Sequence, residues 1–153
     1  MAKITVYSLG YSGRTIQSYI QTLKDAGVTV VADVRDTPQS RFKPEFSKNA
    51  LGESLKKAGI SYIHVKAAGN PKHIRDSADS WDGFKAHLKK NAAGVEDLIA
   101  IIKRNSAVCL TCTCKAVGNA GTEYKPKLEE ENCHRFVLFE ALVKKLPLKV
   151  VHL

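Results

Sequence analysis

The 153-residue chain has no apolar run long enough to cross a membrane, and its N-terminus lacks the hydrophobic region of a secretory signal. It also lacks internal repeats, low-complexity segments and any shift in composition that would mark a second domain. These absences predict one soluble, cytoplasmic domain over residues 1–153, which is large enough to bury a hydrophobic core of its own.

Acidic residues are scarce, because 15 Asp and Glu stand against 24 Lys and Arg, which gives a formal net charge of +9. Such an excess favours a polyanionic partner, most obviously nucleic acid. The alternative is a solvated basic surface, since lysine pairs such as Lys56-Lys57 and Lys144-Lys145 fall in predicted helices. Arginines in predicted loops are more informative, because a guanidinium group binds phosphate or carboxylate through two parallel hydrogen bonds.

Apolar strands alternate with amphipathic helices along the chain. The pattern predicts strands at residues 4–9, 28–34, 60–65, 107–112 and 148–153. It predicts helices at about 15–26, 47–58, 81–104 (as one helix or a broken pair) and from 132 or 133 to about 145. This order is typical of an α/β protein: a single three-layer αβα domain with about five mainly parallel strands and right-handed crossovers.

The charged and reactive residues of the chain follow the ends of these strands. Strand by strand they are Gly10, Tyr11, Ser12 and Arg14; Asp33, Arg35 and Arg41; Asn70, Lys72 and Arg75; Cys112 and Cys114; and His152. In an open parallel sheet all these ends lie on one edge, where such sheets bind ligands. We therefore expect a common cleft, which Cys133 and Arg135 of the last helix also approach.

Two segments are candidates for binding an anion. Tyr11, Ser12 and the backbone amides around Gly10 and Gly13 open onto a predicted helix N-terminus, which is a favourable position for a phosphate. Asp33 can orient Arg35 toward an anion, or the two can form an internal ion pair that only shapes the loop. The glycine-rich turn is too short for a dinucleotide-binding motif, so no dinucleotide cofactor is expected.

Aromatic and basic residues interleave after the second predicted strand, where Phe42 and Phe46 alternate with Arg41 and Lys43. Such a mixture suits stacking on a nucleic-acid base. Phe46 is equally well explained as a core anchor for the helix that follows.

The four cysteines allow three interpretations. Cys109 is expected to be a buried apolar residue, whereas Cys112 and Cys114 share the opposite strand face and are followed, after eighteen residues, by Cys133 and His134. In the first interpretation Cys112, Cys114 and Cys133, with or without His134, bind Zn²⁺. In the second, Cys133 at a helix N-terminus is a thiolate whose pKa is lowered by the helix dipole and nearby cations. In the third, the cysteines only pack.

Five short motifs follow one another along the chain: residues 8–14 (SLGYSGR), 31–35 (VADVR), 38–47 (PQSRFKPEFS), Cys112 with 133–135 (CHR), and 150–152 (VVH). Together they resemble the DUF488 family over the whole length of the chain. The resemblance implies an αβα domain with these motifs in one cleft and does not supply a reaction. The chain departs from the family pattern at Cys114, where the family usually has glutamate.

Two functions from different classes remain open. The first is an enzyme that acts on a nucleotide or a nucleic acid, in which Cys133 and His134 perform nucleophilic or acid–base chemistry and Asp33 is a second ionisable group. Its predicted substrate-binding residues are Tyr11, Ser12, Arg14, Arg35, Arg41 and Arg135. The second is a non-catalytic nucleic-acid-binding module with structural or zinc-binding cysteines. Sulfur chemistry of the rhodanese type ranks last, because the expected loop cradle directly after the strand-end cysteine is missing.

Overall fold

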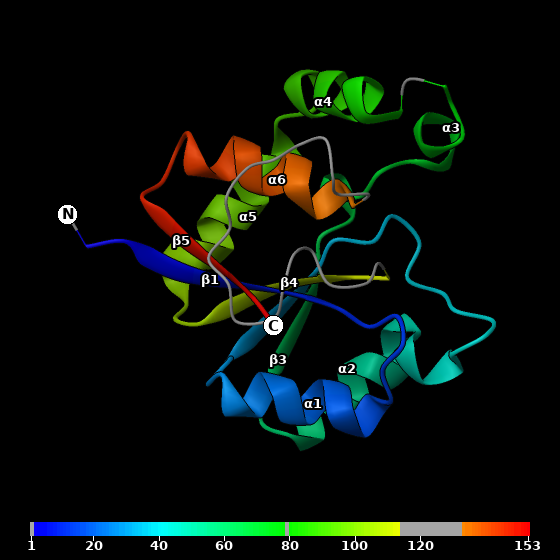
Figure 1. The fold of residues 1–153 in the computed structure, drawn as a ribbon, viewed down its shortest axis with the longest axis vertical. Coiled ribbons are helices and arrows are strands. Elements are labelled where there is room, and N and C mark those ends of the chain that lie inside the picture. Colours follow the sequence, from blue (N-terminus) through cyan, green and yellow to red (C-terminus); the bar gives the residue numbers. More distant parts are fainter. Residues whose placement is uncertain (1, 79, 114–132) are drawn as a thin grey trace.

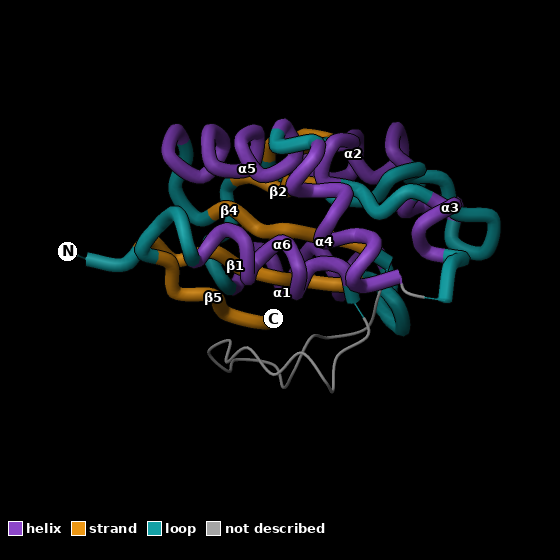
Figure 2. Tube along the Cα trace, turned by 90° about the horizontal axis from the view of Figure 1, so that it is seen from above, coloured by secondary structure: helices purple, strands orange, loops and turns teal. Residues whose placement is uncertain are grey.

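The structure is a computed structural model that describes residues 2–78, 80–113 and 133–153. Its centre is a five-stranded sheet in the order β3-β2-β4-β1-β5, in which every neighbouring pair is parallel. The strands are β1 (Ile4–Gly10), β2 (Val30–Asp33), β3 (Ser61–His64), β4 (Val108–Cys112) and β5 (Leu148–His152). Figure 2 shows β2, β4, β1 and β5 side by side in this order. The predicted α/β class with a parallel sheet is confirmed.

Helices cover both faces of this sheet (Figure 1). One face carries α1 (Ile16–Asp25) and α2 (Lys48–Lys57), and the other carries α4 (Ser80–Lys90), α5 (Ala93–Arg104) and α6 (His134–Val143). The remaining short elements are α3 (Lys72–Arg75) and two 3-10 turns, η1 (Pro44–Phe46) and η2 (Lys66–Ala68). Among the described residues no helix has the length and apolar character that a membrane span requires.

The hydrophobic core consists of two clusters, one on each face of the sheet, and the two central strands contribute to both. Every residue of β2 and β4 is buried, as expected of strands covered on both faces. Because side chains alternate across a strand, Cys109 joins the apolar cluster beneath α1 and α2, whereas Cys112 joins the cluster beneath α5 and α6. The alternation therefore directs Cys112 toward the side of the sheet on which α6 lies.

Local backbone geometry explains one boundary that differs from the predicted range and decides one that the sequence left open. β2 begins at Val30 rather than at residue 28, because the N–H of Val28 donates to the oxygen of Leu23 and closes the end of α1. Gly27 supports this turn with a φ of 75°. The helical stretch at 81–104 forms a broken pair, and the Asn91 side chain donates to the oxygen of His87 where α4 ends.

The topology creates a switch point at the carboxyl ends of β1 and β4. These strands are neighbours, with Gly10 opposite Cys112, yet β1 leads to α1 on one face and β4 precedes α6 on the other. Open α/β sheets bind ligands at such positions, outside the carboxyl ends of the strands.

The contact between α5 and η2 depends on glycine. A Cβ added at Gly94 would lie 2.3 Å from the backbone oxygen of Ala67. We expect Gly94→Ala to lower the free energy of unfolding by about 1–3 kcal/mol, because backbone must move to relieve the clash. Urea denaturation measures the change.

Gly52→Ala in α2 is the matched control, because its Cβ would meet the Tyr62 ring at an ordinary 3.5 Å. Alanine is the better helix former, so this variant should be neutral or more stable by up to about 1 kcal/mol. Equal stability of the two variants would refute the proposed clash.

Candidate active site at the carboxyl edge of the sheet

A cavity of about 120 Å³ lies at the carboxyl edge of the sheet. It is lined by Arg35, Asp36, Thr37, Asn70, Arg75, Cys112, Thr113 and His134. These residues come from the segments that follow β2 and β3, from the end of β4 and the residue after it, and from the first residue of α6. The structure thus brings together Arg35, Cys112 and His134 of the predicted site.

Asp33 holds Arg35 in a fixed orientation. The buried Asp33 carboxylate accepts from Arg35 Nε at 2.9 Å, from Nη2 at 2.6 Å and from its backbone N–H at 3.1 Å. The hydroxyl of Tyr62 donates to the same carboxylate. Burial lowers the pKa of Arg35, but the hydrogen bonds and negative charge of Asp33 raise it by more, so that the pKa lies above its ordinary value. Since its oxygens are occupied in this way, Asp33 positions Arg35.

Tyr62 is kept in its protonated form by the same carboxylate. Burial and the negative charge of Asp33 both raise the pKa of Tyr62 well above its ordinary range. Its hydroxyl therefore remains a hydrogen-bond donor to Asp33 at neutral pH.

Part of the hydrogen-bonding capacity at the cavity is unused. Arg35 Nη1 and Asn70 Oδ1 are buried, and neither has a hydrogen-bond partner within the described part of the chain. The Arg35 guanidinium also lies 5.3 Å from the centroid of the Tyr11 ring, which supports its plane. An unsatisfied buried donor or acceptor costs about 1–3 kcal/mol, so this pair indicates where a polar ligand would bind.

Close backbone packing fixes Arg35 relative to Asn70. A Cβ added at Gly69 would lie 2.5 Å from the Cα of Asp36, so the loops after β2 and β3 touch directly. The His64 imidazole additionally lies 2.7 Å from the backbone oxygen of Arg35. Asn70 belonged to the predicted strand-end group but not to the predicted binding residues; its burial is a tertiary property that the local sequence pattern does not carry.

Two thiols meet beside this cavity. Cys112 ends β4 and Cys133 is the N-cap residue of α6, and their Sγ atoms are 3.2 Å apart in a buried position. Arg135 is completely buried and donates from Nε to Cys133 Sγ at 3.3 Å and from Nη1 to Ser8 Oγ at 2.7 Å. A guanidinium group in this position favours the thiolate form of the pair.

His134 adds an imidazole to the thiol pair. Its Nε2 lies 2.8 Å from the backbone oxygen of Val34. Because a carbonyl oxygen only accepts, Nε2 carries the proton, and Nδ1 is the nitrogen that can bind a proton or a metal.

Ligand atoms of Cys112, Cys133 and His134 lie within 4.8 Å of one another, and these are residue types that bind Zn²⁺. Cys114, the third cysteine of the predicted metal set, lies outside the described residues.

Two of the amides predicted to bind an anion in the turn after β1, those of Tyr11 and Ser12, are already occupied. The N–H groups of Tyr11 and Ser12 donate to the backbone oxygens of Cys112 and Thr113, both at 3.1 Å. These amides therefore extend the β1–β4 ladder and are not available to a phosphate. The Tyr11 ring instead stacks on Phe46 with centroids 4.4 Å apart.

The other predicted arginines lie away from the cavity. Arg14 donates to Thr22 Oγ1 at 3.2 Å and to the backbone oxygen of Leu153 at 3.3 Å, so it joins α1 to the end of the chain. Arg41 is exposed beside Phe42, whose surface is 99% accessible. Neither arginine lines the cavity. Of the two phenylalanines in this segment, Phe46 is a core anchor and Phe42 is exposed.

The environments of the cysteines predict different reactivities. Cys109 is fully buried, and burial raises the pKa of its thiol to about 12. At pH 7 a thiol with that pKa is ionised in about one molecule in 10⁵. We expect iodoacetamide to alkylate Cys133, which contacts Arg135, much faster than Cys109. Peptide mass spectrometry with fragment ions measures both rates, and equal rates near pH 7 would show that Cys133 is a structural thiol.

His152 gives the fold a pH dependence. Burial, reinforced by the positive charge of Arg135, lowers the pKa of His152 to about 4. The unfolded chain, with a histidine pKa near 6.5, therefore binds a proton before the folded chain does as pH falls. We expect this residue's contribution to the free energy of unfolding to be complete above pH 6.5 and to be lost toward pH 4, by up to about 3 kcal/mol.

Urea denaturation from pH 7 to pH 4 tests this expectation, with His152→Gln compared against His73→Gln at an exposed site. The dependence of the free energy of unfolding on pH should become weaker in His152→Gln and stay the same in His73→Gln. If it is unchanged in His152→Gln, another titrating group causes most of the pH dependence.

A family model described as "Domain of unknown function DUF488" matches residues 15–142. Comparison with curated proteins finds no match, and comparison with solved structures also finds none. The matched region includes the Asp33–Arg35 pair, the end of β4 and the Cys-His-Arg start of α6. By this match, over most of its length, the chain belongs to the DUF488 family.

Proposed function

We propose that the protein is an enzyme that acts on a nucleotide or a nucleic acid at the carboxyl edge of its sheet. In this proposal Arg35 binds a phosphate group, and the Cys112–Cys133 pair performs the chemistry. The observation that carries the proposal is the contact between the fully buried Arg135 guanidinium and Cys133 Sγ. A thiol that only packs needs no buried cation, whereas a neighbouring cation stabilises a thiolate nucleophile.

The two sulfurs take different roles. Cys112 lines the cavity, and its Sγ is 3.2 Å from that of Cys133. Negative charge held at Cys133 by Arg135 can therefore draw the proton from Cys112, which is the sulfur that meets the substrate. His134 lines the same cavity as Cys112, and its Nδ1, once protonated, donates a proton to the leaving group.

Charge and exposure support a phosphate-bearing substrate. Arg35 Nη1 is buried without a hydrogen-bond partner in the described residues, and Arg75 lines the same cavity. The loop that carries Arg35 continues to the exposed Arg41 and Phe42, a pair suited to a backbone phosphate and a stacked base. The net charge of +9 favours a polyanion over a free nucleotide.

A second candidate is a non-catalytic nucleic-acid-binding module whose Cys112, Cys133 and His134 hold Zn²⁺. The clustering of their ligand atoms within 4.8 Å favours it. The contact of His134 Nε2 with the oxygen of Val34 also favours it, because metal-bound histidines usually donate their other N–H to such a group.

The test uses the full chain with labelled single- and double-stranded oligonucleotides. Fluorescence anisotropy should show binding that weakens steeply with salt. Arg35→Gln should weaken it at least tenfold, whereas Arg104→Gln, an exposed arginine at the end of α5, should not. Electrophoresis and mass spectrometry of the incubated oligonucleotide should reveal a product that Cys112→Ser abolishes without loss of binding.

Three results would overturn the enzyme proposal. Oligonucleotide binding at low salt that does not depend on Arg35 would show that Arg35 is not the phosphate site. Oligonucleotide binding without any product would show that the protein does not act on it as an enzyme. One equivalent of zinc by elemental analysis, lost in Cys112→Ser together with the fold, would favour the metal-holding module.

A further inference from the structure

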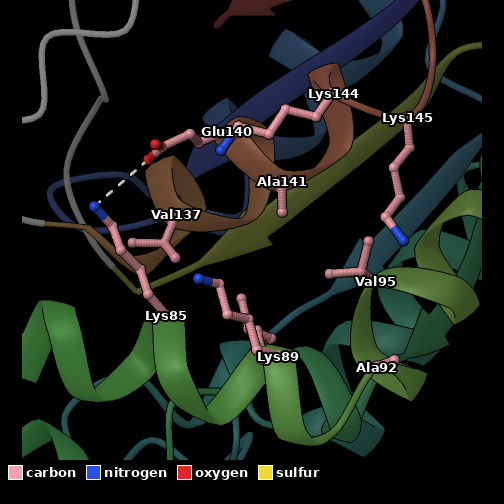
Figure 3. Close-up of a pocket in the computed structure, with 10 residues that line it drawn as sticks. Lys85, Lys89, Ala92, Val95, Val137, Glu140, Ala141, Lys144 and Lys145 are labelled. Carbon is pink, nitrogen blue, oxygen red and sulfur yellow. Dashed lines mark ion pairs between the residues drawn. The ribbon is translucent and has the colours of Figure 1, made fainter.

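A second cavity, of about 530 Å³, lies between α4, α5 and α6 (Figure 3). It shares no lining residue with the cavity at the carboxyl edge of the sheet. The two cavities meet different parts of α6: His134 at its first residue faces the smaller one, and Val137, Glu140 and Ala141 along its side face the larger one.

The floor of this larger cavity is apolar. It is formed by Leu88 of α4, Ala92 and Val95 at the start of α5, and Val137 and Ala141 of α6. Leu88, Val95 and Val137 are each less than one tenth exposed, so they form a fixed surface rather than mobile side chains. A volume of 530 Å³ falls within the range of sites for small molecules.

The rim of the cavity is strongly basic. Lys85, Lys89, Lys144 and Lys145 contribute four positive charges, against the single carboxylate of Glu140. Lys85 Nζ lies 3.8 Å from Glu140 Oε2, and this is the ion pair that the described residues form at the rim. Figure 3 shows the Lys89 and Lys145 amino groups directed toward the space between the helices.

We propose that this cavity binds an amphipathic anion: a single carboxylate or phosphate head carried on an apolar chain. The apolar floor accommodates the chain, because burying it against Leu88, Val95 and Val137 removes apolar surface from water. Lys89, Lys144 and Lys145 attract the head, since Glu140 already pairs with Lys85. A bare phosphate backbone would leave the floor uncovered, and a neutral apolar molecule would leave the lysines unmatched. The inference is independent of the proposed enzymatic function.

Octanoate and octyl phosphate are suitable probes, with octanamide as the uncharged molecule of the same chain length. Isothermal titration calorimetry should show one binding site for each anion and at least tenfold weaker binding of octanamide. In two-dimensional amide NMR, octanoate should shift the signals of Val95, Val137 and Ala141 and leave those of Asp33 and Arg35 unchanged.

The lysines are tested with surface variants that leave the apolar floor intact. Lys89→Gln combined with Lys145→Gln should weaken octanoate binding at least tenfold. Lys24→Gln combined with Lys57→Gln is the matched control, because these exposed lysines lie on α1 and α2, across the sheet. It should leave the affinity unchanged.

Equal binding of octanoate and octanamide would overturn the proposal, as would equal losses in the two lysine pairs. Displacement of octanoate by a short oligonucleotide would also overturn it, because the lysines would then belong to a nucleic-acid surface. None of these outcomes bears on Arg35 or Cys112, so failure here is distinguishable from failure at the strand-end cavity.

Discussion

The buried guanidinium group of Arg135 is the interaction on which both the fold and the candidate site depend. It joins α6 to β1 through Ser8 and contacts Cys133, and its charge adds to the effect of burial in lowering the pKa of His152 on β5. Removing a cation from water costs several kcal/mol unless nearby groups compensate it. The sulfur of Cys133 at 3.3 Å is therefore part of what makes this burial tolerable. The same residue thus connects α6 to the sheet and lies against the sulfur of Cys133.

The buried charge of Arg35 is balanced in a different way from that of Arg135. Its charge is already matched by Asp33, so an incoming anion meets little unbalanced charge from this group. The orientation of the Arg35 guanidinium is nevertheless fixed, because the ring of Tyr11 and the carboxylate of Asp33 prevent it from turning. Its Nη1 is buried and has no hydrogen-bond partner in the described residues. Such a group selects a ligand by geometry more than by charge. Under the proposed function, the basic surface as a whole would supply the long-range attraction of a polyanion.

Much of the architecture follows from local pattern, because alternation of strands and helices and the period-two alternation within β4 are local properties. They predict the parallel sheet and the opposite faces of Cys109 and Cys112. The start of β2 is misjudged for a local reason, whereas the misjudged details of the candidate site are long-range. The amides of Tyr11 and Ser12 are taken up by β4 because β4 inserts beside β1, which only the strand order reveals. Arg14 turns to the last residue of the chain, and Asn70 is buried by a contact between two loops, neither of which has a sequence signal.

The contiguous Cys-His-Arg segment owes its chemistry to the geometry of a helix start. Successive residues of an α-helix are turned by about 100°, so neighbours at its beginning point in different directions. Cys133 reaches Cys112 at the end of β4, His134 reaches the oxygen of Val34 just after β2, and Arg135 reaches Ser8 on β1. Three consecutive residues thereby connect to three adjacent strands. Within the described residues no side-chain cap bond stabilises this helix start, and six residues of α6 are buried, so tertiary packing holds it in place. The position of the Cys112–Cys133 pair is therefore set by the sheet itself, and moving Cys133 requires breaking contacts to β1, β2 and β4 together.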